Sequence, residues 1–303
     1  MIKWARAKTR NRFYIDGRVS RLEQKMGLFH ETLYWQYLCQ KLDYLAELNS
    51  YRLLYQSNMN DRNAVNIVHD ARRTLNVLSN GGIAIIPASV GYGIVATDPI
   101  ALDRIFTTKR RKPHKRHAMI GSYVLHDTIH ILPPQEKDMV RLLTVDLDLP
   151  LGVVAPFRDD HPIIQRLGPD ILSQCTVDGT MSMLVNGGKF QEELSRLAAE
   201  SGLPLMGSSA NLTGMGTKCV VEDIEKEVLE AADIIIDYGR QRFNHPRPSS
   251  TMVDFQKMEV VRFGACYDVI QDAFHRFYGI TLPDDPGREV LLSGHLREEN
   301  RAY

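Results

Sequence analysis

The sequence has few cysteines, no excess of charge of either sign and no long apolar run. Its four cysteines (Cys39, Cys175, Cys219 and Cys266) lie far apart and form no C-x-x-C pair. This pattern argues against a zinc ribbon, a redox motif or a disulfide framework, and it is compatible with a reducing cytosol. Lys+Arg and Asp+Glu are both 37. The chain therefore lacks the basic excess typical of proteins that hold duplex nucleic acid.

No segment indicates export or a membrane. The start, MIKWARAKTRNR, is basic, but no apolar stretch follows it, so we predict no secretory signal. The longest apolar stretch, residues 82–96, is interrupted by Pro87 and three glycines. It cannot supply the roughly 20 apolar residues of a membrane helix. We expect a cytoplasmic protein.

Hydrophobic periodicity divides the 303 residues into three parts. Leucines and aromatic residues recur at helical spacing over residues 18–55, which predicts a helical N-terminal extension over 1–60. We interpret it as packing on the next domain, with a dimer interface or a docking helix as the alternative. The main domain covers 61–266. Residues 267–303 predict a C-terminal helix and a polar surface tail.

Strands and helices mix along the main domain. Short apolar runs predict strands at 83–86, 151–155, 181–185 and 234–237, and a hairpin over 251–255 and 258–263. Helical spacing predicts helices over 61–79, 99–108, 189–201 and 221–232. Residues 123–132 fit strand and loop better than helix, and a loop is expected from 205. This mixture indicates an α/β or α+β fold.

Four segments contain residues suited to ligand binding. PASVGYG (87–93) follows a predicted strand, where glycine permits a sharp turn beside a ligand. KRRKPHKR covers 109–116. GSSANLTG (207–214) can present hydroxyls and backbone N–H groups to phosphate oxygens, and PSSTMVD (248–254) leads into the hairpin. Taken singly, each is more typical of a surface turn, and no Walker A motif occurs.

The basic run at 109–116 has three interpretations. Cations near the end of a helix complement its dipole and are usually solvated. Lysine and arginine together also suit a polyphosphate site. A nuclear-import or nucleic-acid patch is the third.

Two histidines have the spacing of a metal site. His126 and His130 are four residues apart with Asp127 between them. Because strand and loop are predicted there, we interpret both as surface histidines and predict no metal site. Cys175 and Cys219 lack a convincing histidine partner in sequence and are taken as ordinary cysteines.

In this order and spacing, the four segments resemble the YrdC family. Its members include threonylcarbamoyl-adenylate synthases and the carbamoyl-adenylating domains of larger carbamoyltransferases. The resemblance runs from about residue 61 to 264. It rests on GSSANLTG and PSSTMVDF, supported by GGIAIIPASVGYGIVATDP and the K-x-R at 109–111. It implies an α/β (α+β) fold in which a twisted open sheet and its helices form a concave nucleotide site.

The resemblance also implies site residues. The K-x-R and S-x-N motifs of the family fall on four positions, which would be catalytic and surround the nucleotide phosphates: Lys109, Arg111, Ser209 and Asn211. Three more positions would also bind the nucleotide: Thr217, Ser250 and Arg262. Four positions would bind the acceptor: Ala88, Val90, Tyr92 and His117.

The acceptor half departs from the family pattern. Threonine-using members carry P-T-x-T-x-Y-G-L after the first strand, and here Ala88 and Val90 replace both threonines. Two lost hydroxyls remove hydrogen bonds that a small polar amino acid needs. We therefore expect an acceptor other than L-threonine. His117 is out of register with the histidine that follows K-x-R in the family.

A second departure concerns the R-x-P-x-H-P motif that precedes S-x-N in the family. His161 and Pro162 fit its end. Phe157 then falls on the arginine position and Asp159 on the first proline, with Arg158 one residue out of register.

The resemblance implies a soluble enzyme that makes a carbamoyl-type adenylate from ATP, bicarbonate and an amine or amino acid, releasing pyrophosphate. Mg²⁺ is implied by the reaction class, although no carboxylate cluster identifies its ligands. A carbamoyl-adenylate step in a specialised pathway and a non-catalytic RNA- or nucleotide-binding module are the alternatives. Expected partners are tRNA-modification proteins or a second copy through residues 18–55.

Overall fold

The computed structural model describes residues 65–111, 116–244 and 247–296. Contacts divide the chain after Val65, and these residues belong almost wholly to the unit Asn66–Tyr303. The predicted N-terminal helices, and Asp61 as a helix cap, lie outside the described residues. No described helix is both long and apolar enough to cross a bilayer.

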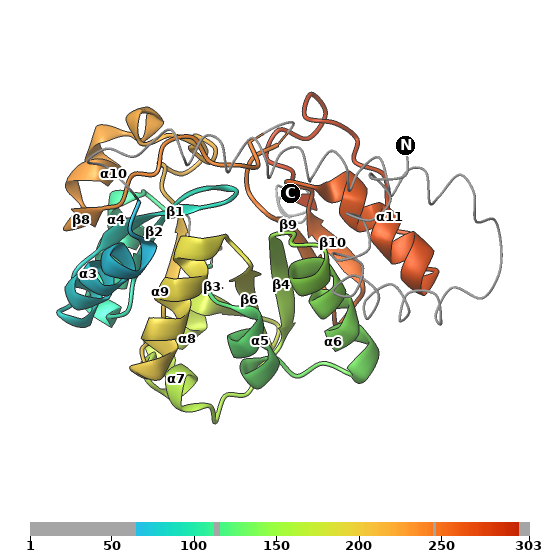
Figure 1. Cartoon of the computed structure of the whole chain (residues 1–303), viewed down its shortest axis with the longest axis horizontal. Coiled ribbons are helices and arrows are strands. Elements are labelled where there is room, and N and C mark those ends of the chain that lie inside the picture. The colour runs from blue at the N-terminus through green and yellow to red at the C-terminus, as the bar shows by residue number, and fades with distance from the viewer. Residues whose placement is uncertain (1–64, 112–115, 245–246, 297–303) are drawn as a thin grey trace, which may run out of the picture. The chain divides into compact units, whose positions relative to one another are not determined.

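The helices and strands alternate along the chain (Figure 1). The helices are α3 (Ile67–Ser79), α4 (Pro99–Thr108), α5 (Tyr123–Ile129), α6 (Pro134–Arg141), η1 (Leu142–Asp146), α7 (Pro162–Gln165), α8 (Gly168–Cys175), α9 (Lys189–Glu200), η2 (Val221–Asp223), α10 (Lys226–Glu230) and α11 (Tyr267–Tyr278). The strands are β1 (Ala84–Ala88), β2 (Gly91–Ala96), β3 (Ala118–Ile120), β4 (Leu151–Pro156), β5 (Thr176–Val177), β6 (Thr180–Val185), β7 (Met206–Ser209), β8 (Ile234–Ile235), β9 (Thr251–Asp254) and β10 (Glu259–Arg262).

All ten strands belong to one mixed sheet. Its order is β10-β9-β4-β6-β3-β7-β2-β1-β8, with β5 paired to β6. β1 and β2 form an antiparallel hairpin, and β7 pairs with both β2 and β3. β4 runs parallel to β9 and antiparallel to β6. A mixed open sheet with helices confirms the predicted α/β fold.

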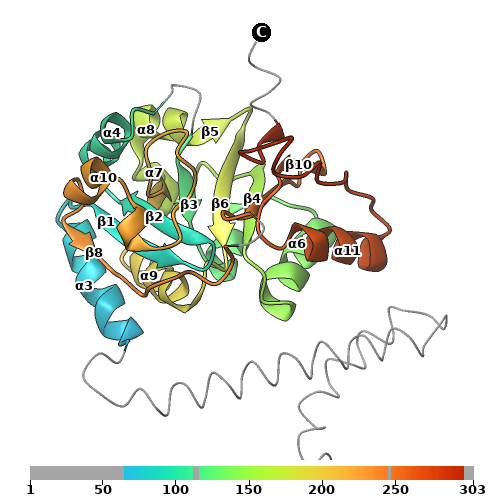
Figure 2. The same ribbon diagram turned by 90° about the horizontal axis from the view of Figure 1, so that it is seen from above.

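Helices cover both faces of the sheet at β1 (Figure 2). Ala84 and Ile86 pack toward α3 and α9, whereas Ile83 and Ile85 join the larger core that includes α4. Because side chains alternate along a strand, burial on both faces requires the continuous apolar run that this strand has.

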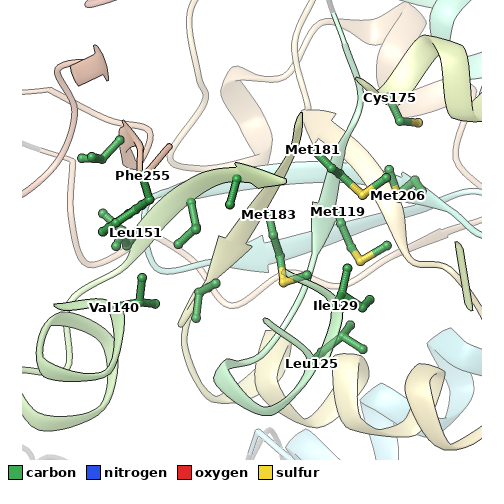
Figure 3. Close-up of a cluster of buried hydrophobic side chains, with 14 of the residues drawn as sticks. Met119, Leu125, Ile129, Val140, Leu151, Cys175, Met181, Met183, Met206 and Phe255 are labelled. Atoms are coloured by element: carbon green, nitrogen blue, oxygen red, sulfur yellow. The ribbon is translucent and has the colours of Figure 1, made fainter. Parts of the chain in front are cut away.

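Methionines fill the centre of the larger core (Figure 3). Met119, Met181, Met183 and Met206 come from β3, β6 and β7 and are all buried. A Cβ atom on Gly121 would lie 2.3 Å from the Met183 sulfur, so the glycine makes room for it. Thioether side chains adapt to such irregular spaces.

Both cysteines singled out by sequence are buried. Burial raises the pKa of Cys175 to about 12, despite the nearby Arg111 and Arg116, and it also raises the pKa of Cys219. Thiolate, and not thiol, is the reactive species, so both fit the prediction of ordinary cysteines.

Several predicted elements are wrong. Residues 123–129 form the helix α5, because the Ser122 side chain accepts from the Leu125 N–H and caps it. His126 and His130 are consequently buried, at 1% and 2% exposure, and are not surface residues. The loop expected from 205 contains the strand β7, since 206–209 pair with β2 and 206–207 pair with β3 as well. The helix predicted over 221–232 is split into η2 and α10.

The predicted surface tail also differs from the structure. After α11, Leu282 and Leu291 are buried in the core, at 3% exposure each. The segment was predicted to be a surface tail because most of its residues are polar and its two buried leucines are nine positions apart.

Candidate functional site

The turn between β1 and β2 contacts two other loops, the one between β6 and α9 and the one between β8 and β9. The Ser89 N–H donates to the Gly187 carbonyl at 2.7 Å, and the Ser89 carbonyl accepts from Phe243 N–H at 2.7 Å. The Ser249 N–H donates to the Val90 carbonyl at 3.0 Å. Segments separated by up to 160 residues along the chain therefore meet within hydrogen-bonding distance of two turn residues.

Gly91 lets a further loop approach this turn. Its φ is +136°, and a Cβ atom there would lie 2.3 Å from Thr217 Cγ2. The Thr217 hydroxyl is 2.5 Å from that of Ser249, which itself has a φ of 72°. A left-handed serine is uncommon, and such strained residues gather at functional sites. Thr217, a predicted nucleotide residue, is thus fixed against the turn.

The K-x-R and S-x-N motifs lie together although 100 residues separate them. Asp98 caps α4, and Lys109 stands at its C-terminal end. Lys109 is only 2% exposed, and its ammonium donates to the Ser209 carbonyl. The Thr213 N–H donates back to the Lys109 carbonyl at 3.1 Å. Because a buried ammonium needs strong acceptors, this contact binds the end of α4 to the loop after β7.

His117 is wholly buried beside these cations. Its exposure is 0%, and its ring faces the backbone of Gly207 without a hydrogen bond of good geometry. Burial, with Arg111 and Lys109 close by, lowers the pKa of His117 to about 3. The imidazole is therefore neutral at physiological pH and adds no charge to the site. Arg111 itself donates to the Arg116 carbonyl.

The S-x-N loop presents further polar atoms. The buried Asn211 donates from Nδ2 to the Leu212 carbonyl at 2.5 Å. Its Oδ1 and the Ser208 hydroxyl are buried without a hydrogen-bond partner in the described part of the chain. A buried polar atom without a partner is costly, and a bound ligand is one way to satisfy it.

Ser250 and Arg262 form a second polar pair. The Arg262 guanidinium donates from Nε to the Ser250 carbonyl at 2.9 Å and from Nη2 to its hydroxyl at 3.0 Å. Ser250 follows Ser249, so this pair adjoins the β1–β2 turn. Ser250 and Arg262 thus contact each other, as Lys109 and Ser209 do.

Two of the predicted acceptor residues, Ala88 and Val90, are surrounded by apolar side chains. Ala88 and Val90 are buried with Ala265, and three partly buried apolar residues pack against them: Leu184, Phe243 and Cys266. The Tyr92 hydroxyl, by contrast, is 2.8 Å from both Asp237 Oδ1 and the Gly239 carbonyl. It is committed to holding the 237–239 segment, so its predicted contact with an acceptor would need that bond to break.

The residues that match the end of the R-x-P-x-H-P motif lie well before β7 in the chain. His161 and Pro162 start the short helix α7. β6 and α9 are the elements that run into β7, and the Asn186-Gly187-Gly188 turn between them reaches Ser89. A glycine pair between a strand and a helix is the sequence signal that this turn could contact Ser89. The signal was not among the four segments identified above.

The residues around Lys109 do not resemble a metal site. No group of three or more His, Cys, Asp or Glu residues within the described ranges could hold a metal ion. The predicted nucleotide side chains are cations, hydroxyls and an amide, whereas Mg²⁺ prefers carboxylates and phosphate oxygens. Any Mg²⁺ here would be held chiefly by the nucleotide.

Comparison with known proteins gives one family and several similar structures. The Sua5/YciO/YrdC family model, described as telomere recombination, matches residues 76–264, which is more than half of the chain. A hypothetical protein from Streptococcus mutans UA159 has a TM-score of 0.59 at 20% identity, over 70% of this chain and 93% of that one. No curated protein matches the sequence.

Two further structures share the fold over part of their length. P. abyssi Sua5, complexed with L-threonine, has a TM-score of 0.55 at 19% identity. The match covers 72% of this chain and 60% of that one. T. kodakarensis HypF has a TM-score of 0.50 at 16% identity, over 65% of this chain and 24% of that one. The described chain thus corresponds to about three fifths of the Sua5 and a quarter of the HypF molecule.

Proposed function

Because this chain belongs to the Sua5/YciO/YrdC family, we propose that it is an enzyme that forms a carbamoyl-type adenylate from ATP, bicarbonate and an amine. The family includes tRNA-modification enzymes, and threonylcarbamoyl-adenylate synthesis is the default activity of the class. In the proposed reaction, the amine and bicarbonate give a carbamate and water. A carbamate oxygen then attacks the α-phosphorus of ATP, and pyrophosphate leaves.

One observation carries the proposal. Lys109 of K-x-R contacts Ser209 of S-x-N directly, through a buried ammonium and a backbone carbonyl. The contact brings the two motifs that the family resemblance assigns to the nucleotide phosphates to one place in the fold. The contact supports a shared phosphate site made by the end of α4 and the loop after β7.

The residue types suit the transfer of an adenylyl group. Negative charge develops on phosphate oxygens as pyrophosphate departs, and fixed cations and donors stabilise it. Lys109 and Arg111 would supply the charge. The Ser209 hydroxyl and the Asn211 side chain would supply oriented donors.

His117 would contribute no charge to the site, so the positive charge would come from Lys109 and Arg111. With its pKa lowered to about 3, it is neutral, so it can both donate and accept a hydrogen bond. One ring nitrogen faces the Gly207 backbone, and the other would be open to a bound ligand.

The acceptor is proposed to be an amine other than L-threonine. Ala88, Val90 and their apolar neighbours offer no hydroxyl to a small polar amino acid. The Ser89 hydroxyl, which is buried and unpartnered among the described residues, is the exception and could replace one lost bond. A site lacking hydrogen-bonding groups gains little from a hydroxyl on its substrate.

The test supplies the enzyme with ATP, Mg²⁺ and radiolabelled bicarbonate, together with L-threonine or amines of increasing apolar surface. We expect labelled adenylate with apolar amines and little or none with L-threonine. Efficient labelling by L-threonine alone would show that the acceptor assignment is wrong while the reaction class stands. No labelled adenylate with any amine would count against the reaction itself.

A non-catalytic nucleotide-binding module is the second candidate. The same buried cations and unpartnered polar atoms would serve nucleotide binding without turnover. Binding of ATP with no pyrophosphate release under any acceptor would favour this candidate.

A further inference from the structure

The segment after α11 pairs with the edge strand of the sheet. Arg262 of β10 and His295 form an antiparallel bridge, and the Phe263 N–H donates to the Gly294 carbonyl at 2.9 Å. A Cβ atom on Gly294 would lie 2.2 Å from the Phe263 carbonyl oxygen, so this close approach requires glycine. Residues 279–296, called here the C-terminal strap, thus cover an edge that would otherwise be open.

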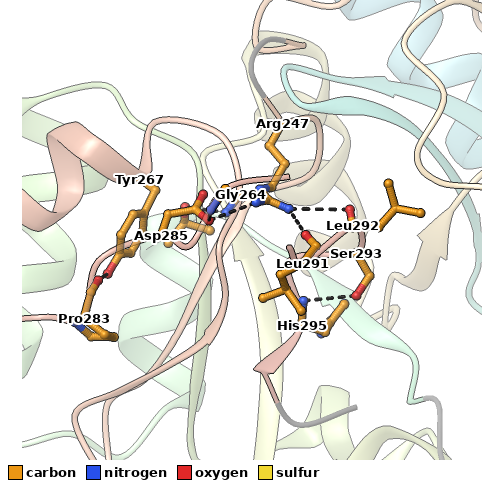
Figure 4. A network of polar contacts seen from close by, with 11 residues as sticks. Arg247, Gly264, Tyr267, Pro283, Asp285, Leu291, Leu292, Ser293 and His295 are labelled. Atoms are coloured by element: carbon orange, nitrogen blue, oxygen red, sulfur yellow. Dashed lines mark hydrogen bonds and ion pairs between the residues drawn. The ribbon is translucent and has the colours of Figure 1, made fainter. Parts of the chain in front are cut away.

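A buried arginine anchors the strap (Figure 4). Arg247 is 4% exposed, and its Nη2 lies 2.9 Å from Asp285 Oδ1. Its Nη1 donates to the Leu291 carbonyl. A guanidinium so deeply buried is stable only with its charge paired and its donors satisfied, and the strap supplies both partners. Together with the buried Leu282 and Leu291, this fixes the strap on the domain.

The strap brings His295 to Arg262. His295 Nε2 lies 3.4 Å from Arg262 Nη1. Arginine has no acceptor, so any hydrogen bond here runs from the guanidinium to a neutral imidazole. The other two guanidinium nitrogens face Ser250, as described above. Contacts on Nε, Nη1 and Nη2 together hold the plane of the guanidinium.

His295 lies outside the family match, which ends at residue 264, whereas Arg262 and Ser250 lie within it. We propose that the strap is part of the nucleotide site and that His295 is a positioning residue, which orients Arg262 toward the nucleotide. The inference rests on the proposed function, in which Arg262 and Ser250 lie near the nucleotide. His295 itself need not touch ATP, because it acts through Arg262.

The experiment compares steady-state pyrophosphate release by the full chain and three variants. His295→Ala removes the acceptor facing Arg262. His295→Gln restores a neutral acceptor of similar reach. His275→Ala, on the exposed face of α11, is the matched control. We expect His295→Ala to raise the KM for ATP about fivefold, the effect of losing one hydrogen bond, with kcat nearly unchanged. We expect His295→Gln to return KM toward the wild-type value and the control to leave it unchanged.

The outcomes separate the two ideas. An unchanged KM in His295→Ala, with an active wild type, would overturn the positioning role alone. A fall in kcat and melting temperature that His295→Gln does not correct would overturn it too, because it indicates a merely structural role. A wild type that neither binds nor turns over ATP would remove the proposed function and, with it, this inference.

Discussion

The most informative single residue is Lys109, a cation that the fold has taken out of water. Its ammonium donates to the Ser209 carbonyl. A carbonyl offsets only part of the cost of burying a charge. A phosphate group would offset more of that cost, and this fits the proposed role of Lys109 in a phosphate site.

We predict that Lys109→Ala weakens ATP binding. Losing one charge-assisted contact to phosphate costs about 2 kcal/mol, or roughly 30-fold in Kd. Titration calorimetry with ATP and Mg²⁺ measures it, with Lys226→Ala as the control because Lys226 is exposed on α10. Equal ATP affinity in wild type and Lys109→Ala would exclude Lys109 from the phosphate site.

At this scale, sequence analysis could find residues that stand in local motifs. Lys109, Arg111, Ser209 and Asn211 follow fixed short spacings. Arg247 and Ser249 could not be found in this way. The partner of Arg247 lies 38 residues further on, and the left-handed backbone of Ser249 depends on contacts with Val90 and Thr217.

Among the elements, α5 shows how local preference misleads. Its β-branched residues Val124, Thr128 and Ile129 favour a strand by propensity. The Ser122 cap and packing against the core outweigh that preference and place two histidines one turn apart. His126 Nδ1 and His130 Nδ1 are 2.7 Å apart, so one donates a proton to the other.

We predict that this pair makes the protein acid-sensitive. Burial lowers the pKa of His126 to about 4 and that of His130 to about 3, below the ordinary value of 6.5. The facing charges are those of Asp127, which opposes the shift, and Lys137. Because the unfolded chain then binds more protons, stability is complete above about pH 6.5 and falls as the pH drops toward 4. The loss by pH 4 should be roughly 6 kcal/mol, because both histidines contribute.

Denaturant unfolding at several pH values tests this. The double variant His126→Leu/His130→Leu should flatten most of the dependence between pH 6.5 and 4, and the exposed His69→Ala should not. Some slope should remain, because His117 shifts in the same direction. A double variant with the wild-type slope would mean that the pair is not the cause.

Element boundaries were predicted well where a local signal fixes them. Asp98 and Pro99 begin α4 at the predicted residue, and Gly202 follows the end of α9 in a left-handed conformation. β7 was missed because its Met-Gly-Ser-Ser sequence has no strand signature. It becomes a strand only because β2 and β3 flank it.

For the whole molecule, the balance of charge favours an enzyme over a protein whose main role is to bind nucleic acid. Equal numbers of acidic and basic residues leave no long-range field to attract a polyanion. Lys109 is turned inward, and Arg110 pairs with Glu227 at 2.9 Å. Both features reduce what the basic run could offer to RNA.

We therefore predict weak, strongly salt-dependent binding of duplex RNA. Counterion release makes such binding fall steeply between 50 and 200 mM salt. Fluorescence anisotropy with a labelled duplex, across this range, measures it. Tight binding that persists at the higher salt, together with no turnover, would favour a nucleic-acid-binding module over an enzyme.

The overall fold followed from the alternation of elements, but the C-terminal strap did not. Its sequence is polar and contains two prolines. Its packing becomes visible only in the structure, where Leu282 and Leu291 are buried in the core. Long-range contacts of this kind have no local periodicity. They connect the strap to residues inside the family match, which ends at residue 264.

The most direct test of the proposed activity is which phosphate product leaves ATP. Wild-type protein is supplied with ATP, Mg²⁺, bicarbonate and an apolar amine, and pyrophosphate and orthophosphate are measured separately. Attack at the α-phosphorus predicts pyrophosphate release that requires both bicarbonate and the amine and is strongly reduced in Lys109→Ala. Release of orthophosphate alone, or pyrophosphate release independent of bicarbonate, would contradict the account.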